Sequence, residues 1–168
     1  MKKALTLIIA CFLAITIAHA QTGWVTHKAD NRISVKFPSE PVENPPGSFI
    51  ATTKDSTVAF VLTVVDFVQV ANIDSVTLAP IKTTPEFAAQ LKTGIAQSMP
   101  NVDLSDFTIG TWKGFTSYTA TGKDTKMKRY DIFMFIIGNK LYSVSTVTVN
   151  GASLEGRDIF VKSIMLSN

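Results

Sequence analysis

The sequence predicts an α+β domain in which an antiparallel sheet of about six or seven strands is covered by helices, as an α/β/α sandwich. Residues 128–149 hold two runs rich in β-branched and aromatic residues on either side of Gly138-Asn139, a dipeptide typical of a tight hairpin turn. The first of these runs and residues 57–67 are apolar on both faces, which indicates central strands covered on both sides. Two amphipathic helical patterns supply candidate covers.

The first twenty residues carry the pattern of a secretory signal. Two lysines precede an apolar run over residues 4–18, and Ala18-His19-Ala20 offers small residues for cleavage before Gln21. The apolar run is shorter than the roughly 20 residues that span a bilayer, which favours cleavage over a retained anchor. Cys11 leaves lipidation open as a minor alternative. We therefore expect export, to the periplasm or beyond, of one domain comprising residues 21–168.

Composition narrows the function classes. Without Lys2 and Lys3, the 16 basic residues fall to 14 against 13 acidic ones, a net charge of about +1. This balance gives no case for a nucleic-acid partner. Cys11 is the single cysteine, so the cleaved chain can form no disulfide, thiolate metal site or cysteine nucleophile.

The N-terminal half of the domain reads as strands. Residues 24–30 are a candidate edge strand, and residues 32–37 alternate with Ile33, Val35 and Phe37 on one face. Four prolines between positions 38 and 46 predict an extended loop. Two further strands are predicted over 48–54 and 57–67, the second beside the central hairpin.

A helix is predicted from Pro85 to about Met99. Thr84 can cap it, a proline suits its first turn, and Pro100 ends it. Phe87, Ala88, Leu91 and Ile95 form an apolar stripe that should cover one sheet face. The preceding connection, residues 68–82, has room for a short helical turn near residues 73–78.

The C-terminal half adds strands over 102–111 and 115–121, which turn at Lys113-Gly114, followed by the central hairpin. Ser153 is the candidate cap of a final helix that ends near Leu166. This amphipathic helix would carry the apolar residues Leu154, Ile159, Phe160 and Ile164 and cover one face of the sheet.

The R-I-S-V-K-F-P-x-x-P stretch at residues 32–41 and the F-V-K-S-I stretch at 160–164, with the strand and helix order, resemble the PsbP-like fold family. The chain is similar to the small exported bacterial members of that family. The resemblance implies an α/β/α sandwich, a setting outside the cytoplasm, and a binding or assembly role without catalytic residues. No position matches a metal ligand, so no metal or cofactor is expected.

Catalytic patterns are sparse. His27 is the single histidine of residues 21–168, and it reads as a solvated side chain rather than a general base. The sequence holds no G-x-S-x-G elbow and no calcium-binding loop, and its aspartates are scattered singly. A hydrolase would require His27 to lie beside a serine and an acid.

Two turns offer candidate partner contacts. One is basic and holds Lys123, Lys126, Lys128 and Arg129, which could dock an acidic protein or an anionic lipid surface. The other carries Trp112, Lys113 and Phe115. A solvated hairpin end and ordinary turn packing are the competing interpretations.

The sequence thus favours a monomeric, exported, non-enzymatic domain that binds another protein of the cell envelope or assists assembly. The alternative is a module that binds a small molecule or lipid in a pocket between helix 85–99 and the sheet. A hydrolase ranks third. The identity of the partner or ligand stays open.

Overall fold

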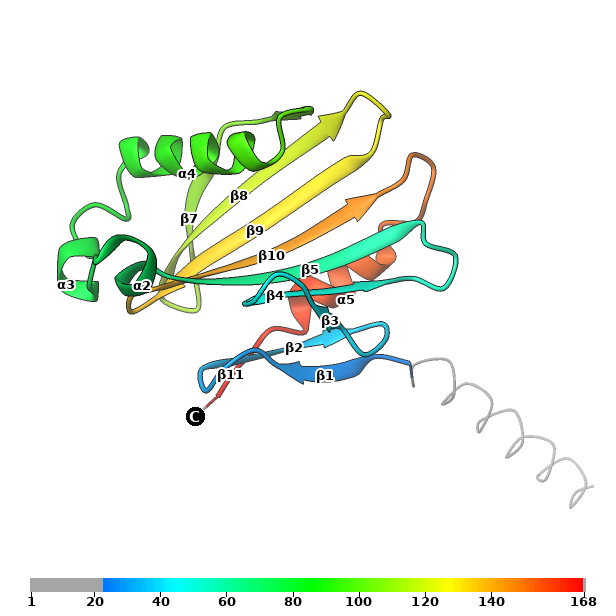
Figure 1. Cartoon of the computed structure of the whole chain (residues 1–168), viewed down its shortest axis with the longest axis horizontal. Helices are drawn as coiled ribbons and strands as arrows, with labels where there is room; N and C mark the ends of the chain where they lie inside the picture. Colours follow the sequence, from blue (N-terminus) through cyan, green and yellow to red (C-terminus); the bar gives the residue numbers. More distant parts are fainter. Residues whose placement is uncertain (1–22, 168) are drawn as a thin grey trace, which may run out of the picture.

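The computed structural model describes residues 23–167 and confirms an α+β fold built on antiparallel strands (Figure 1). The main sheet has eight strands: β3 (Val42–Glu43), β4 (Ser48–Thr52), β5 (Val58–Asp66), β6 (Val102–Leu104), β7 (Thr108–Trp112), β8 (Phe115–Asp124), β9 (Arg129–Ile137) and β10 (Lys140–Thr148). A second sheet has three: β1 (Val25–Lys28), β2 (Ile33–Phe37) and β11 (Met165–Leu166). The helices are α2 (Phe67–Ala71), α3 (Ser75–Leu78), α4 (Pro85–Ser98) and α5 (Glu155–Lys162).

The predicted hairpin lies at the centre of the main sheet. The order of strands across the main sheet is β3-β4-β5-β10-β9-β8-β6, and β7 also pairs with β8. The two strands of the hairpin, β9 and β10, therefore have neighbours on both sides. The turn uses Gly138 with a positive φ of 62°. A Cβ at this position would lie 2.7 Å from Nη1 of Arg32, whose guanidinium donates to the carbonyl of Ile137. Glycine is therefore favoured there by the backbone conformation, and any side chain would also displace the Arg32 guanidinium.

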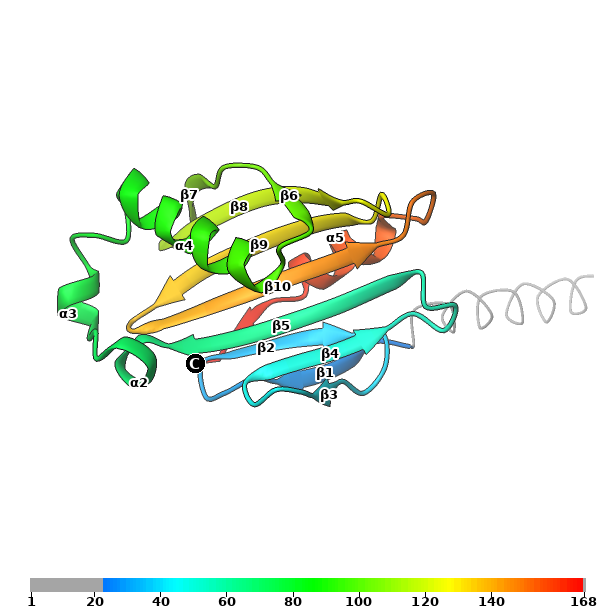
Figure 2. The same cartoon turned by 45° about the horizontal axis from the view of Figure 1, so that its top comes forward.

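Helix α4 covers one face of the main sheet (Figure 2). The hydroxyl of Thr84 accepts from the backbone N–H of Phe87 at 3.2 Å, which confirms the predicted cap. Phe87 and Ala88 are buried against Tyr118, while Leu91 and Ile95 pack at the margin of the same cluster. The side chains of this cluster pack in the space between helix 85–99 and the sheet, where a pocket was predicted.

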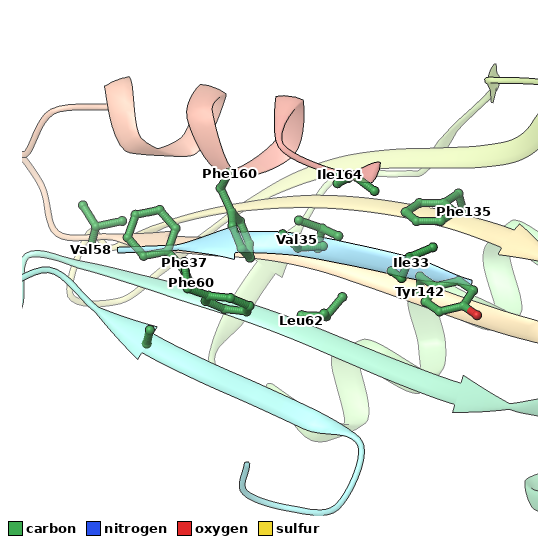
Figure 3. Close-up of a cluster of buried hydrophobic side chains, with 12 residues drawn as sticks. Ile33, Val35, Phe37, Val58, Phe60, Leu62, Phe135, Tyr142, Phe160 and Ile164 are labelled. Carbon is green, nitrogen blue, oxygen red and sulfur yellow. The ribbon is translucent and has the colours of Figure 1, made fainter. Parts of the chain in front are cut away.

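The three-stranded sheet and α5 cover the opposite face. Ile33, Val35 and Phe37 of β2 are fully buried, as the alternation predicts. Phe160 of α5 points toward Phe37 and Phe60, with ring centroids 5.0 and 5.2 Å away (Figure 3). This face therefore has two covers, where the sequence analysis expected one helix.

Strand β2 lies outside the main sheet because its apolar face is buried face to face against that sheet. This second sheet was not predicted from the sequence. The predicted strand 102–111 is also divided, into β6 and β7. The Ser105 hydroxyl accepts from the N–H of Thr121 at 3.1 Å, so a side chain replaces a backbone partner where the two strands separate.

The final helix is shorter than predicted. It ends at Lys162, because the Ser163 hydroxyl donates to the Phe160 carbonyl and accepts from the N–H of Lys36. Residues 165–166 then pair with β2. Of the four apolar residues expected on this helix, Phe160 and Ile164 are buried, whereas Ile159 is 39% exposed and Leu154 is the exposed N-cap residue.

The predicted secretory signal, including Cys11, lies outside the described residues. Within residues 23–167, no helix combines the length and apolar character needed to cross a membrane.

Candidate functional site

The seven residues predicted as partner contacts lie at opposite ends of β8. Trp112, Lys113 and Phe115 surround the turn before this strand, and Lys123 to Arg129 surround the turn after it. At about 3.3 Å per strand residue, the two turns are about 25 Å apart. The structure therefore does not unite them into one surface.

The aromatic turn is packed against the rest of the domain. The Trp112 ring lies 4.5 Å from the Phe135 ring and 5.9 Å from the Phe133 ring, centroid to centroid. The ammonium group of Lys113 lies 4.8 Å from the Trp112 ring centroid and donates to the Ile164 carbonyl. These contacts join the β7–β8 turn to the segment after α5, as expected of ordinary turn packing.

The basic turn is more open. Asp124 shapes it, since one carboxylate oxygen accepts from the backbone N–H groups of Lys126 and Lys128 at 2.9 and 2.8 Å. Lys123 and Lys126 are exposed. The side chains of Lys123, Lys126 and Lys128 form no ion pair within residues 23–167. Two exposed lysines and the half-buried Lys128 thus lie at one end of β8 and β9.

Arg129 is different, because its side chain lines a cavity on the sheet face beside α5. The cavity has a volume of about 430 Å³, within the range of small-molecule sites. It lies on the face opposite α4, where Figure 2 shows α5 behind the main sheet. Its lining comes from β7 to β10, from α5 and from the β6–β7 connection: Ser105, Asp106, Thr108, Thr119, Ala120, Thr121, Arg129, Asp131, Ile132, Phe133, Val144, Thr146, Arg157, Asp158 and Val161.

Strand register assembles this lining. Thr146 of β10 is paired with Asp131 of β9, which is paired with Thr121 of β8. Paired residues on neighbouring strands point to the same face, so these three side chains form a polar row across the sheet. In the next row toward the hairpin turn, Val144 and Phe133 provide an apolar part of the wall.

Asp131 is the centre of an ion-pair network. Its carboxylate, 12% exposed, accepts two hydrogen bonds from Arg129, each 2.7 Å long, and one from Arg157 at 3.1 Å. Arg157 in turn donates to Asp158 at 2.8 and 3.0 Å. The hydrogen bonds that Arg129 donates to Asp131 raise the pKa of Arg129. The hydrogen bonds that Arg157 donates to Asp158, and then the negative charge of Asp131, raise the pKa of Arg157. Both guanidinium groups are held charged and oriented.

Thr146 adds an unusual feature. Its side chain is 1% exposed, and its hydroxyl has no hydrogen-bond partner among residues 23–167. A buried hydroxyl without a partner costs free energy, so its position in a cavity wall is consistent with a partner supplied by a ligand or by solvent.

The chemistry of the cavity suits recognition. Both oxygens of Asp131 already accept from guanidinium groups, which leaves this carboxylate poorly placed to take a proton from a substrate. Its fixed charges are oriented before any ligand arrives. Within residues 23–167, no cluster of three or more histidine, cysteine or acidic side chains could hold a metal ion.

His27 lies elsewhere, and the prediction of a solvated side chain is wrong. Its ring packs between Phe49 and Phe37, with centroids 4.4 and 5.9 Å away. Its Nε2 atom is buried and has no hydrogen-bond partner among the described residues. His27 does not line the cavity, and no serine or acid of residues 23–167 is hydrogen-bonded to its Nε2 atom, as a hydrolase would require.

Of the seven predicted contact residues, only Arg129 lines this cavity. The sequence reasoning missed Asp131, Thr146 and Arg157 as a group. One signal was available, because Asp131 is the single charge inside the apolar run 130–137 and shares the parity of Phe133 and Phe135. Arg157 offered no comparable signal, since it reaches the sheet only through the placement of α5.

Comparisons with known proteins place the fold. No family model and no curated protein matches the chain. The solution structure of cyanobacterial PsbP (CyanoP) from Synechocystis matches with a TM-score of 0.61 and 10% sequence identity, covering 85% of this chain and 91% of that chain. A crystal structure from Bacteroides thetaiotaomicron matches with a TM-score of 0.49 and 14% identity, covering 88% of this chain and 49% of that one. The PsbP-like fold is confirmed.

Proposed function

We propose that this chain is an exported, non-catalytic binding domain that holds a ligand in the cavity beside α5. The observation that carries the proposal is the cavity itself, with a wall in which Arg129, Asp131 and Arg157 are locked together by ion pairs. A site whose polar groups are fixed in advance loses little entropy when a ligand binds.

Export and an accessory role are parts of the same proposal. The secretory pattern of residues 1–20 supports export to the periplasm or beyond. The likeness to the PsbP-like fold supports a binding or assembly role outside the cytoplasm, as the family resemblance implies. N-terminal sequencing of the mature protein tests cleavage before Gln21 against lipidation at Cys11.

Filling the cavity tests the binding role. We expect a thermal-shift screen of soluble metabolites to yield compounds that stabilise the wild-type protein but not a Thr121→Trp variant. Thr121 lies in the cavity lining and is exposed enough to accept an indole ring. Thr52→Trp, at an exposed position of β4, is the matched control. Equal responses of both variants, or no stabilising compound, would contradict the proposal.

Protein docking through the basic turn is a second candidate function, favoured by the exposed lysine charges of Lys123 and Lys126. Crosslinking in the native envelope, followed by mass spectrometry, would identify an acidic partner. Replacing Lys123, Lys126 and Lys128 by Glu should abolish the crosslinks. Arg129 is left intact in this variant because it holds Asp131. Crosslinks that survive the charge reversal would rule out this surface.

A further inference from the structure

The charges of the cavity wall balance once Lys92, which lies just outside it, is included. The wall holds two cations, Arg129 and Arg157, and the three carboxylates of Asp106, Asp131 and Asp158. Asp106 is paired with Lys92 outside the wall at 2.7 Å, so three cations balance three anions. A ligand with a net charge would add an uncompensated charge to this wall, and a neutral ligand would not.

Hydrogen-bonding capacity nevertheless remains. The wall carries the hydroxyl-bearing side chains of Thr108, Thr119 and Thr121, and the buried hydroxyl of Thr146 has no hydrogen-bond partner among residues 23–167. Each hydroxyl can both donate and accept. The carboxylates and guanidinium groups add acceptors and donors at fixed positions. The wall therefore suits a ligand whose own groups donate and accept in turn.

An apolar surface lies beside these polar groups. The side chains of Phe133, Val144 and Val161 line the same cavity. The Phe133 ring is held in place by its edge contact with Trp112 at 5.9 Å. A fixed aromatic ring can pack against weakly polar C–H groups of a ligand.

We infer that the cavity binds a neutral polyhydroxylated molecule of the size of a mono- or disaccharide. Such a molecule has three properties that match the wall. Its adjacent hydroxyls donate and accept hydrogen bonds, its C–H face can pack against the apolar side chains, and it carries no net charge. The inference depends on the proposed binding function and adds the chemical class of the ligand.

A charge series tests this class. Glucose, glucuronate and glucosamine share one ring and differ in charge, and neutral hexoses, N-acetylglucosamine and neutral disaccharides extend the panel. We expect at least one neutral sugar to shift the backbone amide resonances of Thr119, Asp131 and Thr146 in an NMR titration. We expect it to bind about tenfold more tightly than a charged derivative of the same ring.

Thr146→Val removes the buried hydroxyl and keeps the shape of the side chain. It should weaken binding of that sugar about five- to tenfold, the usual effect of one hydrogen bond. Thr63→Val on β5 is the matched control, since Thr63 is paired with Ser143 on the opposite face of the sheet. It should leave the Kd unchanged.

Three results would overturn the inference. The first is tighter binding of glucuronate or glucosamine than of glucose, and the second is the absence of a resonance shift with any neutral sugar at millimolar concentration. The third is an unchanged Kd in Thr146→Val. If the metabolite screen still yields compounds blocked by Thr121→Trp, the binding function survives and only the ligand class is wrong. If that screen also fails, both proposals fall.

Discussion

The hydroxyl of Tyr142 donates a hydrogen bond of 2.7 Å to the carboxylate of Asp30. Tyr142 belongs to β10 of the main sheet, and Asp30 lies between β1 and β2 of the small sheet, so this bond joins the two layers. Lys140 donates to the same carboxylate oxygen at 3.0 Å. Burial and then Asp30 itself raise the pKa of Tyr142, which keeps the hydroxyl protonated as a donor.

Replacing Asp30 should therefore weaken the contact between the layers. We expect Asp30→Ala to lower the free energy of unfolding by about 1.5–3 kcal/mol, because it leaves the buried Tyr142 hydroxyl without its acceptor. Urea unfolding followed by tryptophan fluorescence measures the change. Asp103→Ala, at an exposed position of β6, is the control and should stay within about 0.5 kcal/mol of wild type. If the two substitutions lowered the free energy of unfolding equally, Asp30 would not stabilise the contact between the layers.

The same carboxylate predicts a dependence on pH. Burial of Asp30 opposes its ionisation, but hydrogen bonds from the Arg32 backbone, Tyr142, Lys140 and the Ile33 backbone outweigh burial and lower its pKa. Its contribution to stability is complete above the unfolded-state pKa of about 3.9 and is lost as the pH falls through the lower folded-state pKa. The stability gap between wild type and Asp30→Asn should thus be constant from pH 7 to 5 and shrink below pH 4. A gap that widened in acid would contradict the assigned direction.

The start of α4 depends on Thr84. Thr84→Ala removes the hydroxyl that accepts from the N–H of Phe87, and it should cost about 1 kcal/mol of unfolding free energy. Chemical denaturation measures this loss. Thr83→Ala, at the exposed neighbouring position outside the cap, should change stability by less than half as much. The assignment of the cap would be wrong if the two variants behaved alike.

Helix α5 is anchored by one aromatic ring. Phe160→Ala should cost about 3–4 kcal/mol, because Phe160 is fully buried between Phe37 and Phe60. The adjacent Ile159 is 39% exposed, and Ile159→Ala should cost about 1 kcal/mol or less. Thermal unfolding of both variants distinguishes them. A similar loss for both would contradict the assignment of Phe160 as the anchor of α5.

Local signals predicted the elements that depend on local chemistry. The turn at Gly138-Asn139, the cap at Thr84 and the alternation of Ile33, Val35 and Phe37 are each decided within a few residues, and each is confirmed. The placement of β2 outside the main sheet is not local. An alternating strand can pair at an edge or lie across a face with the same pattern, so its sequence could not decide between them.

The candidate site was harder to predict from the sequence for the same reason. Its polar row joins Thr146, Asp131 and Thr121 from three strands, and only the register of those strands brings them together. Parity indicates which residues of one strand share a face, but not which residue of the next strand lies beside them. The single contact residue that the sequence analysis shared with the cavity, Arg129, was chosen for its charge at a turn.

The pairing of β11 with β2 joins Met165 and Leu166 to Ser34 and Ile33. A ribosome releases Ser34 long before Met165, so one edge of β2 stays unpaired until residues 165–166 have been synthesised. Contacts between such distant segments slow folding. The layer formed by the small sheet over the main sheet is therefore expected to close late in folding, after the local hairpins of the main sheet.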